Sequence, residues 1–447
     1  MSASPSWTSR LSFAALRALR RRLGGRVDRF LRRGAGSVRR ELVADPRVAE
    51  AVLAHVAATG ESEARAWQRV HEYAREIVPS FSLVAYYRFG YLVARGLIPL
   101  FYRVSVGYEA REALNAIPRT SSVVYLMNHR SNADYVVVAF VLSGEVALSY
   151  AVGEWARVWP LETLFKSFGS YFVRRGYPEP LYHKVLERYV QLATRHGVTQ
   201  GIFLEGGLSR DGRFRPPKLG LLDNLVRTKL EPGFDLPLTI IPVAINYDRV
   251  LEDRSLLREL QSPAERLPRR EQILEVARYV LKVSTRFLLR RARRYGRACV
   301  NFGAPLRVDD WLAENPGVLL LPREQRLARL RALADDVMAR IAAVMPVTAV
   351  ALASDALLRH PGDSISRESW EARIADLRLV LKGSRAPVVG DDRTNDQLLD
   401  RALVMLTLRR VVVAVGREYR IDRSQEPLLR YYANSIAHYF EPYETPA

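Results

Sequence analysis

The chain has 447 residues, of which 48% are hydrophobic and 26% charged, so it can bury a large core and is not disordered throughout. A single cysteine, Cys299, excludes an intramolecular disulfide and every multi-cysteine metal site. The net charge of +20 favours an anionic membrane, a nucleic acid or a phosphate-bearing substrate as partner.

Half of the net positive charge, +10 of +20, lies in residues 1–40. Residues 1–40 hold eleven arginines and one acid, Asp28. Apolar residues recur at spacings of three and four over residues 10–33, which predicts a basic amphipathic helix. It suits an anionic membrane surface, and a solvated or packed arm is the alternative. No unbroken apolar run follows the first arginines, so we expect no secretory signal peptide; an organelle transit peptide is a further alternative.

Residues 41–107 prolong this region. A polar helical hairpin is predicted over residues 41–78, followed by an aromatic, apolar and sparsely basic segment over 79–107. Tyrosines among arginines suit a membrane interface, and a buried core helix is the alternative. No stretch is a convincing transmembrane helix, which needs about 18–20 apolar residues with few charges. We therefore assign residues 1–108 to a membrane-associating region.

The pattern changes at about residue 110, where short β-branched runs begin to alternate with helical stretches. The predicted strands are Ser122–Met127, Val146–Val152, Gly201–Leu204, Leu238–Ile245 and Ala298–Phe302, and the clearest helices are Glu179–His196 and Arg269–Tyr295. This alternation predicts an α/β fold with a central, mostly parallel sheet flanked by helices. Such sheets bind ligands beyond the carboxyl ends of their strands. The α/β domain is assigned to residues 109–345, and residues 346–447 form a mostly helical C-terminal region.

The first chemical signal is His129 and Asp134 in the segment NHRSNAD, which directly follows a predicted strand. A turn at this point can bring the carboxylate back to the imidazole. The carboxylate would fix the tautomer and stabilise the imidazolium, so that the other ring nitrogen can take a proton. The plain structural alternative is that Asp134 caps a helix and His129 is a satisfied loop histidine.

Three further segments follow, namely GSYFVRR at 169–175, FLEGGLSRDGRFR at 203–215 and IPVAINYD at 241–248. Glycines let backbone N–H groups approach an anion closely, and Arg210, Arg213, Arg215 and Lys218 supply positive charge for a phosphate. Each segment alone also has an ordinary structural explanation, as a solvated arginine pair, a turn or a strand end.

In this order and spacing, the four segments resemble the blocks of the glycerolipid acyltransferase family. Three more stretches are similar to the membrane-associated glycerol-3-phosphate 1-acyltransferases and their dihydroxyacetone-phosphate relatives: PPKLG at 216–220, VNFGAPL at 300–306 and LLRYYANSIAHYF at 428–440. One position departs from the pattern, because Leu208 stands where the family usually has an arginine. One expected phosphate ligand is therefore missing.

The resemblance implies transfer of a fatty acyl group from acyl-CoA or acyl carrier protein to the 1-hydroxyl of glycerol 3-phosphate, which forms lysophosphatidic acid. His129 would be the general base, oriented by Asp134. Backbone N–H groups near Asp134 would stabilise the developing oxyanion. No metal or organic cofactor is required. The implied substrate-binding residues are Arg174, Glu205, Gly206, Arg210, Lys218 and Pro242.

We expect a membrane-associated protein, at the cytoplasmic face of a bacterial inner membrane or on an organelle membrane. Lysophosphatidic acid and dihydroxyacetone phosphate are the alternative acceptors. Two other functions are weaker: a catalytically inactive scaffold of the same fold, and a nucleic-acid-binding protein, which would need basic patches spread among exposed aromatic residues.

Overall fold

The computed structural model describes residues 33–81, 101–142, 148–153, 161–174, 176–261 and 296–441, together with residues 30, 98 and 99. Most of the basic segment 10–33, residues 82–97 of the aromatic segment and the predicted helix 269–295 lie outside the described residues.

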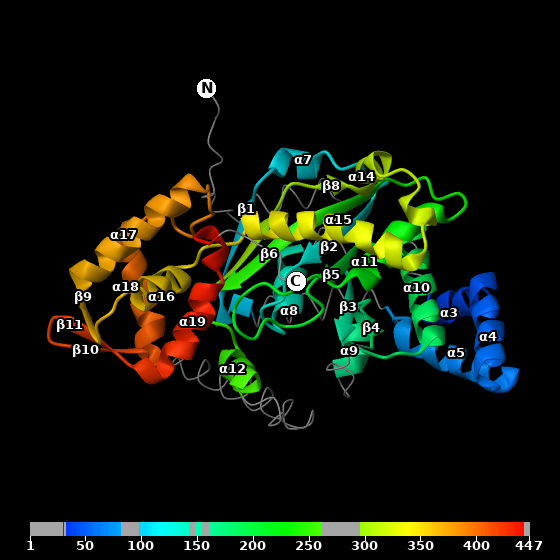
Figure 1. Ribbon diagram of the computed structural model, residues 1–447, viewed down its shortest axis with the longest axis horizontal. Coiled ribbons are helices and arrows are strands. Elements are labelled where there is room, and N and C mark those ends of the chain that lie inside the picture. Colours follow the sequence, from blue (N-terminus) through cyan, green and yellow to red (C-terminus); the bar gives the residue numbers. More distant parts are fainter. Residues whose placement is uncertain are drawn as a thin grey trace.

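A central eight-stranded sheet organises the described part of the chain (Figure 1). Its strand order is β1-β7-β6-β2-β5-β3-β4, with β8 beside β6. Neighbours are parallel except that β7 and β8 run antiparallel to β6, which confirms the mostly parallel sheet expected from the sequence. The strands are β1 (Arg103–Tyr108), β2 (Ser122–Met127), β3 (Ser149–Gly153), β4 (Tyr171–Val173), β5 (Gln200–Phe203), β6 (Leu238–Tyr247), β7 (Arg297–Phe302) and β8 (Leu306–Arg307).

Helices cover both faces of this sheet. Alternate residues of β2 enter two different cores: Val124 and Leu126 enter one, and Tyr125 and Met127 enter the other. The first core is closed by α10 (Pro180–Arg195), α11 (Leu219–Val226) and α15 (Arg323–Ala343). The second is closed by α8 (Asp134–Leu142) and by the C-terminal region. The remaining elements of this part are α7 (Arg111–Asn115), α9 (Leu161–Ser167), η3 (Arg227–Leu230), α12 (Asp253–Gln261), α14 (Val308–Glu314) and η5 (Val318–Leu320).

Three N-terminal helices pack beside α10, namely α3 (Ala35–Val43), α4 (Pro46–Thr59) and α5 (Glu63–Ile77). The Asp45 carboxylate accepts a hydrogen bond from the Arg47 N–H and so caps α4. The buried Arg188 of α10 holds Asp45 and Glu231 at 2.6 Å each. The polar hairpin expected over residues 41–78 is thus α4 and α5, fixed to the α/β domain by a buried arginine.

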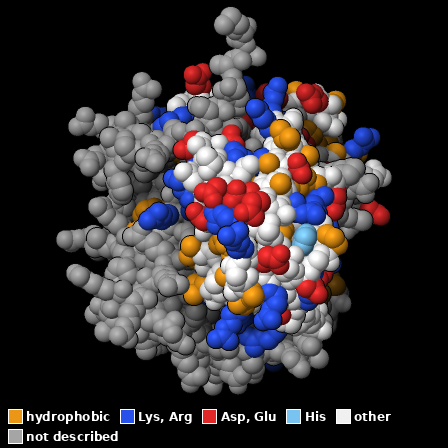
Figure 2. All heavy atoms as spheres, turned by 90° about the vertical axis from the view of Figure 1, so that its left-hand side faces the viewer, with side chains coloured by type: hydrophobic (Ala, Val, Ile, Leu, Met, Phe, Trp, Pro, Cys, Tyr) orange, Lys and Arg blue, Asp and Glu red, His pale blue; other side chains and the backbone are white. Residues whose placement is uncertain are grey.

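The C-terminal region is largely helical, as expected, with α16 (Ala349–Leu358), α17 (Arg367–Gly383), α18 (Asn395–Leu408), α19 (Glu426–Asn434), η6 (Arg423–Gln425) and η7 (Ala437–Tyr439). It also contains a small antiparallel sheet of β9 (Ser364–Ser366), β10 (Val412–Val415) and β11 (Glu418–Ile421), ordered β10-β11-β9, which the sequence pattern does not predict. Figure 2 shows acidic and basic side chains lying next to one another on this end of the molecule. Among the described residues, no helix is long and apolar enough to cross a membrane.

Candidate active site

His129 and Asp134 lie together beyond the carboxyl end of β2, as the sequence predicts. Nδ1 of His129 is 2.9 Å from Oδ2 of Asp134, and both side chains are almost fully buried. Asp134 is the first residue of α8, so the turn between strand and helix brings the carboxylate back to the ring. Because a carboxylate accepts hydrogen bonds, Nδ1 of His129 carries a proton and donates it to Asp134. Nε2 is then the ring nitrogen that would accept a proton.

The Asp134 carboxylate is held by more than the histidine. Its Oδ2 accepts the backbone N–H groups of Arg130 at 2.7 Å and Ser131 at 3.0 Å. Its Oδ1 accepts the hydroxyl of Tyr247, the last residue of β6, at 2.5 Å. Burial and the Asp134 charge raise the pKa of the Tyr247 hydroxyl well above its ordinary value, so the hydroxyl stays a donor. These bonds fix the carboxylate in one orientation.

Aromatic rings fix the imidazole from two directions. The ring of Phe203, at the end of β5, stacks on His129 with centroids 3.9 Å apart and an interplanar angle of 21°. Tyr135 meets the imidazole edge-on at 5.6 Å. The base is therefore positioned by packing as well as by its hydrogen bond to Asp134.

Glu205 joins the histidine loop to the loop after β5. One carboxylate oxygen accepts the N–H of His129 at 3.0 Å and the other accepts the N–H of Arg215 at 3.0 Å. Burial raises the pKa of Glu205 to about 7, although the nearby Arg130 charge and the two N–H groups favour the ionised form. In the structure, Glu205 sets the distance between these two loops; its predicted contact with substrate stays a prediction.

Glu252 supports the residues between His129 and Asp134. It accepts the Ser131 hydroxyl at 2.6 Å and the Asn132 N–H at 3.2 Å. Burial, together with repulsion from Asp134, raises the pKa of Glu252 to about 7, against the hydrogen bond from Ser131. The Ala133 N–H bonds the Ser131 hydroxyl oxygen. All four backbone N–H groups of residues 130–133 thus have acceptors within the protein, so the expected oxyanion donors next to Asp134 are already occupied in this structure.

The loop after β5 docks against the C-terminal region. Gly212 has φ of +90°, and a Cβ at this position would lie 1.9 Å from the Tyr431 carbonyl oxygen of α19. The Gly212 carbonyl accepts Nη1 of the buried Arg130, and the Asp211 carbonyl accepts Nδ2 of Asn434 at 2.8 Å. Arg130, the residue after His129, is therefore bonded to a loop that packs directly against α19.

The three residues predicted to bind phosphate have different surroundings, because two arginines are paired with carboxylates and the lysine is exposed. Nε and Nη2 of Arg174 bond the two Glu76 oxygens of α5 at 2.8 and 2.6 Å, and these bonds raise the pKa of Arg174. Nε of Arg210 bonds Glu259 at 3.2 Å. Lys218 is exposed and packs against Gly206, where φ is +64° and a Cβ would meet Lys218 Cγ at 2.7 Å. Their phosphate contacts stay predictions.

Pro242 lies inside the sheet rather than at its edge. It is opposite Leu126 of β2, and its carbonyl accepts the Gly303 N–H at 2.8 Å. Three positions further along β6, Ile245 exchanges two hydrogen bonds with the Asn128 side chain. Pro242 therefore lies in the sheet, three residues along β6 before the position that contacts the histidine loop. Its contact with substrate stays a prediction.

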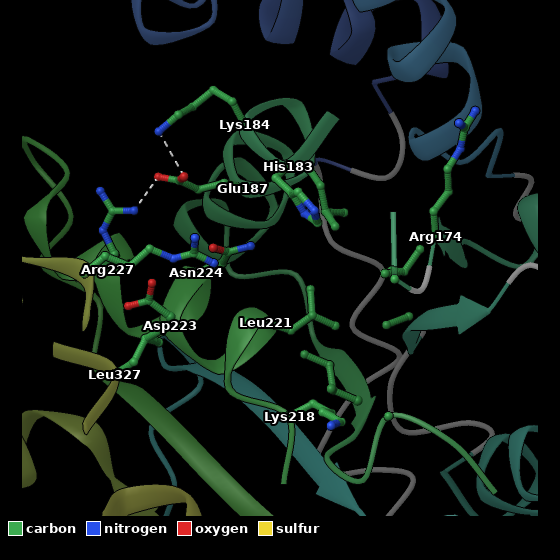
Figure 3. Close-up of a pocket in the computed structure, with 18 of the residues that line it drawn as sticks. Arg174, His183, Lys184, Glu187, Lys218, Leu221, Asp223, Asn224, Arg227 and Leu327 are labelled. Carbon is green, nitrogen blue, oxygen red and sulfur yellow. Dashed lines mark hydrogen bonds and ion pairs between the residues drawn. The ribbon is translucent and has the colours of Figure 1, made fainter. Parts of the chain in front are cut away.

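A cavity of about 1,030 Å³ adjoins the block of residues around Gly206 (Figure 3). It is bounded by α10 on one side and α11 on the other, and Phe203, Gly206 and Lys218 lie at its edge near β5. Arg174 also lines it, but Figure 3 shows its side chain extending away from Lys218. Among the described residues, no group of three or more His, Cys, Asp or Glu side chains could hold a metal ion.

Two family models match the chain. The acyltransferase model matches residues 110–246, and the model of the glycerol-3-phosphate acyltransferase C-terminal region matches residues 275–442. The chain belongs to the glycerolipid acyltransferase family. The histidine–aspartate pair and Glu205 fall within the match to the acyltransferase model, and Tyr247 directly follows it.

Curated relatives agree with this assignment. The glycerol-3-phosphate acyltransferase of Aeromonas hydrophila is 30% identical over 85% of this chain and 47% of its own length. The enzyme of the same name from Pseudoalteromonas atlantica is 29% identical over 77% of this chain and 43% of its own. The chain thus spans about half the length of the curated relatives it matches. Among solved structures, the lysophosphatidic acid acyltransferase PlsC of Thermotoga maritima matches with a TM-score of 0.32 and 17% identity, over 65% of this chain and 87% of that one.

Several residues of the site were not predicted from the sequence. Tyr247 lies inside the segment IPVAINYD, but its hydroxyl contact with Asp134 depends on β6 lying beside β2. Glu252 belongs to a segment with no chemical pattern of its own, and Tyr431 lies in the stretch 428–440, for which the sequence predicted no contact with the loop after β5. Phe203 carries only the signal of an apolar strand end. Each of these residues acts through its position in the fold.

Proposed function

We propose that the chain transfers a fatty acyl group from a thioester donor to the 1-hydroxyl of glycerol 3-phosphate. The observation that carries this proposal is the buried His129–Asp134 pair at the carboxyl ends of parallel strands. The names of the curated relatives support glycerol 3-phosphate as acceptor.

His129 is the general base of the proposed reaction. Its Nε2 takes the proton from the acceptor hydroxyl while the oxygen attacks the thioester carbonyl, so that a C–O bond forms and the C–S bond then breaks. The imidazolium, stabilised by Asp134, returns the proton to the leaving thiolate. Such positioned proton transfer contributes on the order of 10²–10⁴-fold to the rate. No acyl-enzyme is needed, because the acceptor itself is the nucleophile.

The experiment is an acceptor-by-variant assay. Purified protein on anionic vesicles receives palmitoyl-CoA or palmitoyl carrier protein, with glycerol 3-phosphate, dihydroxyacetone phosphate or lysophosphatidic acid. We expect glycerol 3-phosphate to be the best acceptor and His129→Ala to lower its turnover about 10²–10⁴-fold. His71→Ala is the matched control, because His71 is exposed on α5 and does not line the cavity beside Gly206. Wild-type turnover in His129→Ala would refute the mechanism, and a preference for another acceptor would replace the substrate.

Membrane association is part of the proposal. The basic residues 1–40 would attract an anionic surface with about 1 kcal/mol per basic residue near it. Deleting residues 1–40 should weaken vesicle binding most at low salt, because salt screens exposed charges. Vesicle flotation at several salt concentrations measures this, and equal flotation of both proteins at every concentration would remove the electrostatic anchor.

A further inference from the structure

The loop after β5 lacks the arginine that the glycerolipid acyltransferase family usually has at position 208. Leu208 offers no charge there, because its half-buried side chain packs against the apolar core that α8 and the C-terminal region close. Leu208 also does not line the cavity beside Gly206. A chain that binds a phosphorylated acceptor therefore needs another residue to supply the missing positive charge.

Arg215 reaches this position from the other end of the same loop. The loop turns back at Ser209, whose hydroxyl accepts the Gly212 N–H at 3.0 Å and donates to the Arg213 carbonyl at 2.6 Å. Nη1 of Arg215 then donates to the Leu208 carbonyl oxygen at 3.2 Å. The guanidinium therefore lies against the backbone of the position at which the family has its own arginine.

The charge of Arg215 is not used up by the fold. Arg215 is half-buried and lines the cavity together with Lys218, and within the part of the chain that the structure describes no ion pair joins either cation to a carboxylate. Glu205 lies close, but its oxygens accept the backbone N–H groups of Arg215 and His129 at 3.0 Å each. Among the described residues, only the Leu208 carbonyl bonds the Arg215 guanidinium, so Nε and Nη2 can donate to a ligand.

The other arginines of this loop are placed differently. Nε of Arg210 pairs with Glu259 at 3.2 Å, and Nη1 of Arg213 pairs with Glu441 at 2.9 Å. Neither arginine lines the cavity. Arg215 is therefore the arginine that this loop presents to the cavity.

This end of the cavity adjoins the histidine. Phe203 lines the cavity, and its ring stacks on His129 with centroids 3.9 Å apart. The Ser209 N–H donates to the His129 carbonyl at 3.0 Å, which fixes the loop against the histidine. A phosphate at Arg215 thus lies on the histidine side of the cavity, which suits an acceptor whose reacting hydroxyl is three carbons from its phosphate.

We propose that Arg215, together with Lys218, binds the acceptor phosphate and so takes the place in space of the arginine missing at position 208. This inference rests on the proposed function and adds a ligand that the family resemblance does not imply. Nη1 stays on the Leu208 carbonyl, Nε and Nη2 donate to two phosphate oxygens, and Lys218 adds a point charge.

Turnover kinetics test this assignment. Arg215→Leu should raise KM for glycerol 3-phosphate about tenfold, because it removes two charge-assisted hydrogen bonds, and should leave kcat and the KM of the acyl donor unchanged. Arg215→Lys should fall between, because an ammonium keeps the charge but not the planar fork. Arg329→Leu is the matched control, since Arg329 is exposed on α15 and does not line the cavity. Equal KM values for glycerol 3-phosphate in Arg215→Leu and Arg329→Leu would overturn the proposal.

Moving the charge separates a binding role from damage to the loop. The double variant Leu208→Arg, Arg215→Leu returns an arginine to the family's position, so its KM for glycerol 3-phosphate should come back to within about threefold of wild type. A damaged loop would not be repaired by a second substitution. A double variant that unfolds at the wild-type midpoint and still has the raised KM would contradict the proposal, and for an unstable double variant the comparison of Arg215→Leu with Arg329→Leu decides.

Binding without an acyl donor tells the failure of this inference from that of the proposed function. Isothermal titration measures the Kd of glycerol 3-phosphate for wild type and for Arg215→Leu. Wild type that binds it, about tenfold more tightly than the variant, but transfers no acyl group would refute the proposed function and leave Arg215 as a phosphate ligand. Wild type that acylates glycerol 3-phosphate, beside a variant with the same KM and Kd, would refute the role of Arg215 and leave the function standing.

Discussion

Tyr247→Phe removes one hydrogen bond from the Asp134 carboxylate. The Tyr247 hydroxyl is 2.5 Å from Oδ1 of Asp134, whereas Oδ2 receives His129 and two backbone N–H groups. A buried hydrogen bond to a charged group contributes about 1.5–3 kcal/mol. We therefore expect the variant to lose about that much free energy of unfolding, measured by chemical denaturation.

The variant should also change the pH dependence of the reaction. Without the tyrosine, the negative charge of Asp134 is less delocalised into hydrogen bonds, so it stabilises the imidazolium of His129 more strongly. The pKa of His129 rises, and the acidic limb of kcat/KM against pH moves to higher pH. A shift of one pH unit corresponds to about 1.4 kcal/mol, so we expect a shift of up to about one unit.

Tyr102→Phe is the matched control. Tyr102 is buried with its ring 5.2 Å from Tyr247, but its hydroxyl bonds the Arg249 carbonyl at 2.8 Å. Its loss should cost about 0.5–1.5 kcal/mol of stability and leave the pH profile in place. Identical pH profiles for both variants, with equal losses of stability, would refute the view that Tyr247 acts through Asp134.

Two further substitutions probe the loops around the pair. Burial holds the pKa values of Glu205 and Glu252 at about 7 in the folded state against 4.5 when unfolded, so both lower wild-type stability as pH rises from about 4.5 to about 7. Glu205→Gln should remove about half of this fall, since Glu252 contributes the rest, and should cost about 1–3 kcal/mol, since one backbone N–H loses its acceptor. Unfolding curves between pH 4 and 8 measure both effects. Gly212→Ala should cost at least about 1–3 kcal/mol and lower activity, because its Cβ would strike the Tyr431 carbonyl at a φ of +90°. Gly220→Ala, where a Cβ meets nothing within 4 Å, is its control, and equal stability of the two alanine variants would contradict the docking of this loop.

The parts of the fold that repeat a local pattern could be predicted from the sequence. Four of the five predicted strands match observed ones within about two residues at each end, because buried strands are runs of β-branched residues that need no distant partner to be recognised. The fifth, predicted from Val146, is observed as β3 from Ser149. Short strands such as β4 and β9, each of three residues, carry too little pattern, and β1 was hidden in an aromatic segment interpreted as a membrane interface.

The residues of the site also fall into those that local sequence predicts and those that only the tertiary structure brings together. His129 and Asp134 were predicted because five residues of sequence determine their contact. Tyr247 is 113 residues from Asp134, and only the register of β6 against β2 brings its hydroxyl there. The pairing of Arg174 with Glu76 spans 98 residues and depends on α5 packing beside β4. Contacts of this kind follow from tertiary structure, which local pattern does not encode.

The contact of Gly212 with Tyr431, together with the hydrogen bond from Asn434 to Asp211, forms a seam between the α/β domain and α19. This seam limits which substitutions homologues can carry. At this point the backbone of α19 fills the space that a side chain would need, and Asn434 closes the same seam through the Asp211 carbonyl. A larger residue at position 212 would be tolerated only if α19 moved away. A displaced α19 would no longer hold the Gly212 loop against Arg130, the residue after His129. Residues on the two sides of the seam should therefore covary among homologues, and a chimera that joins the α/β domain of one homologue to the C-terminal helices of another should keep full stability only when both sides of the seam come from the same parent.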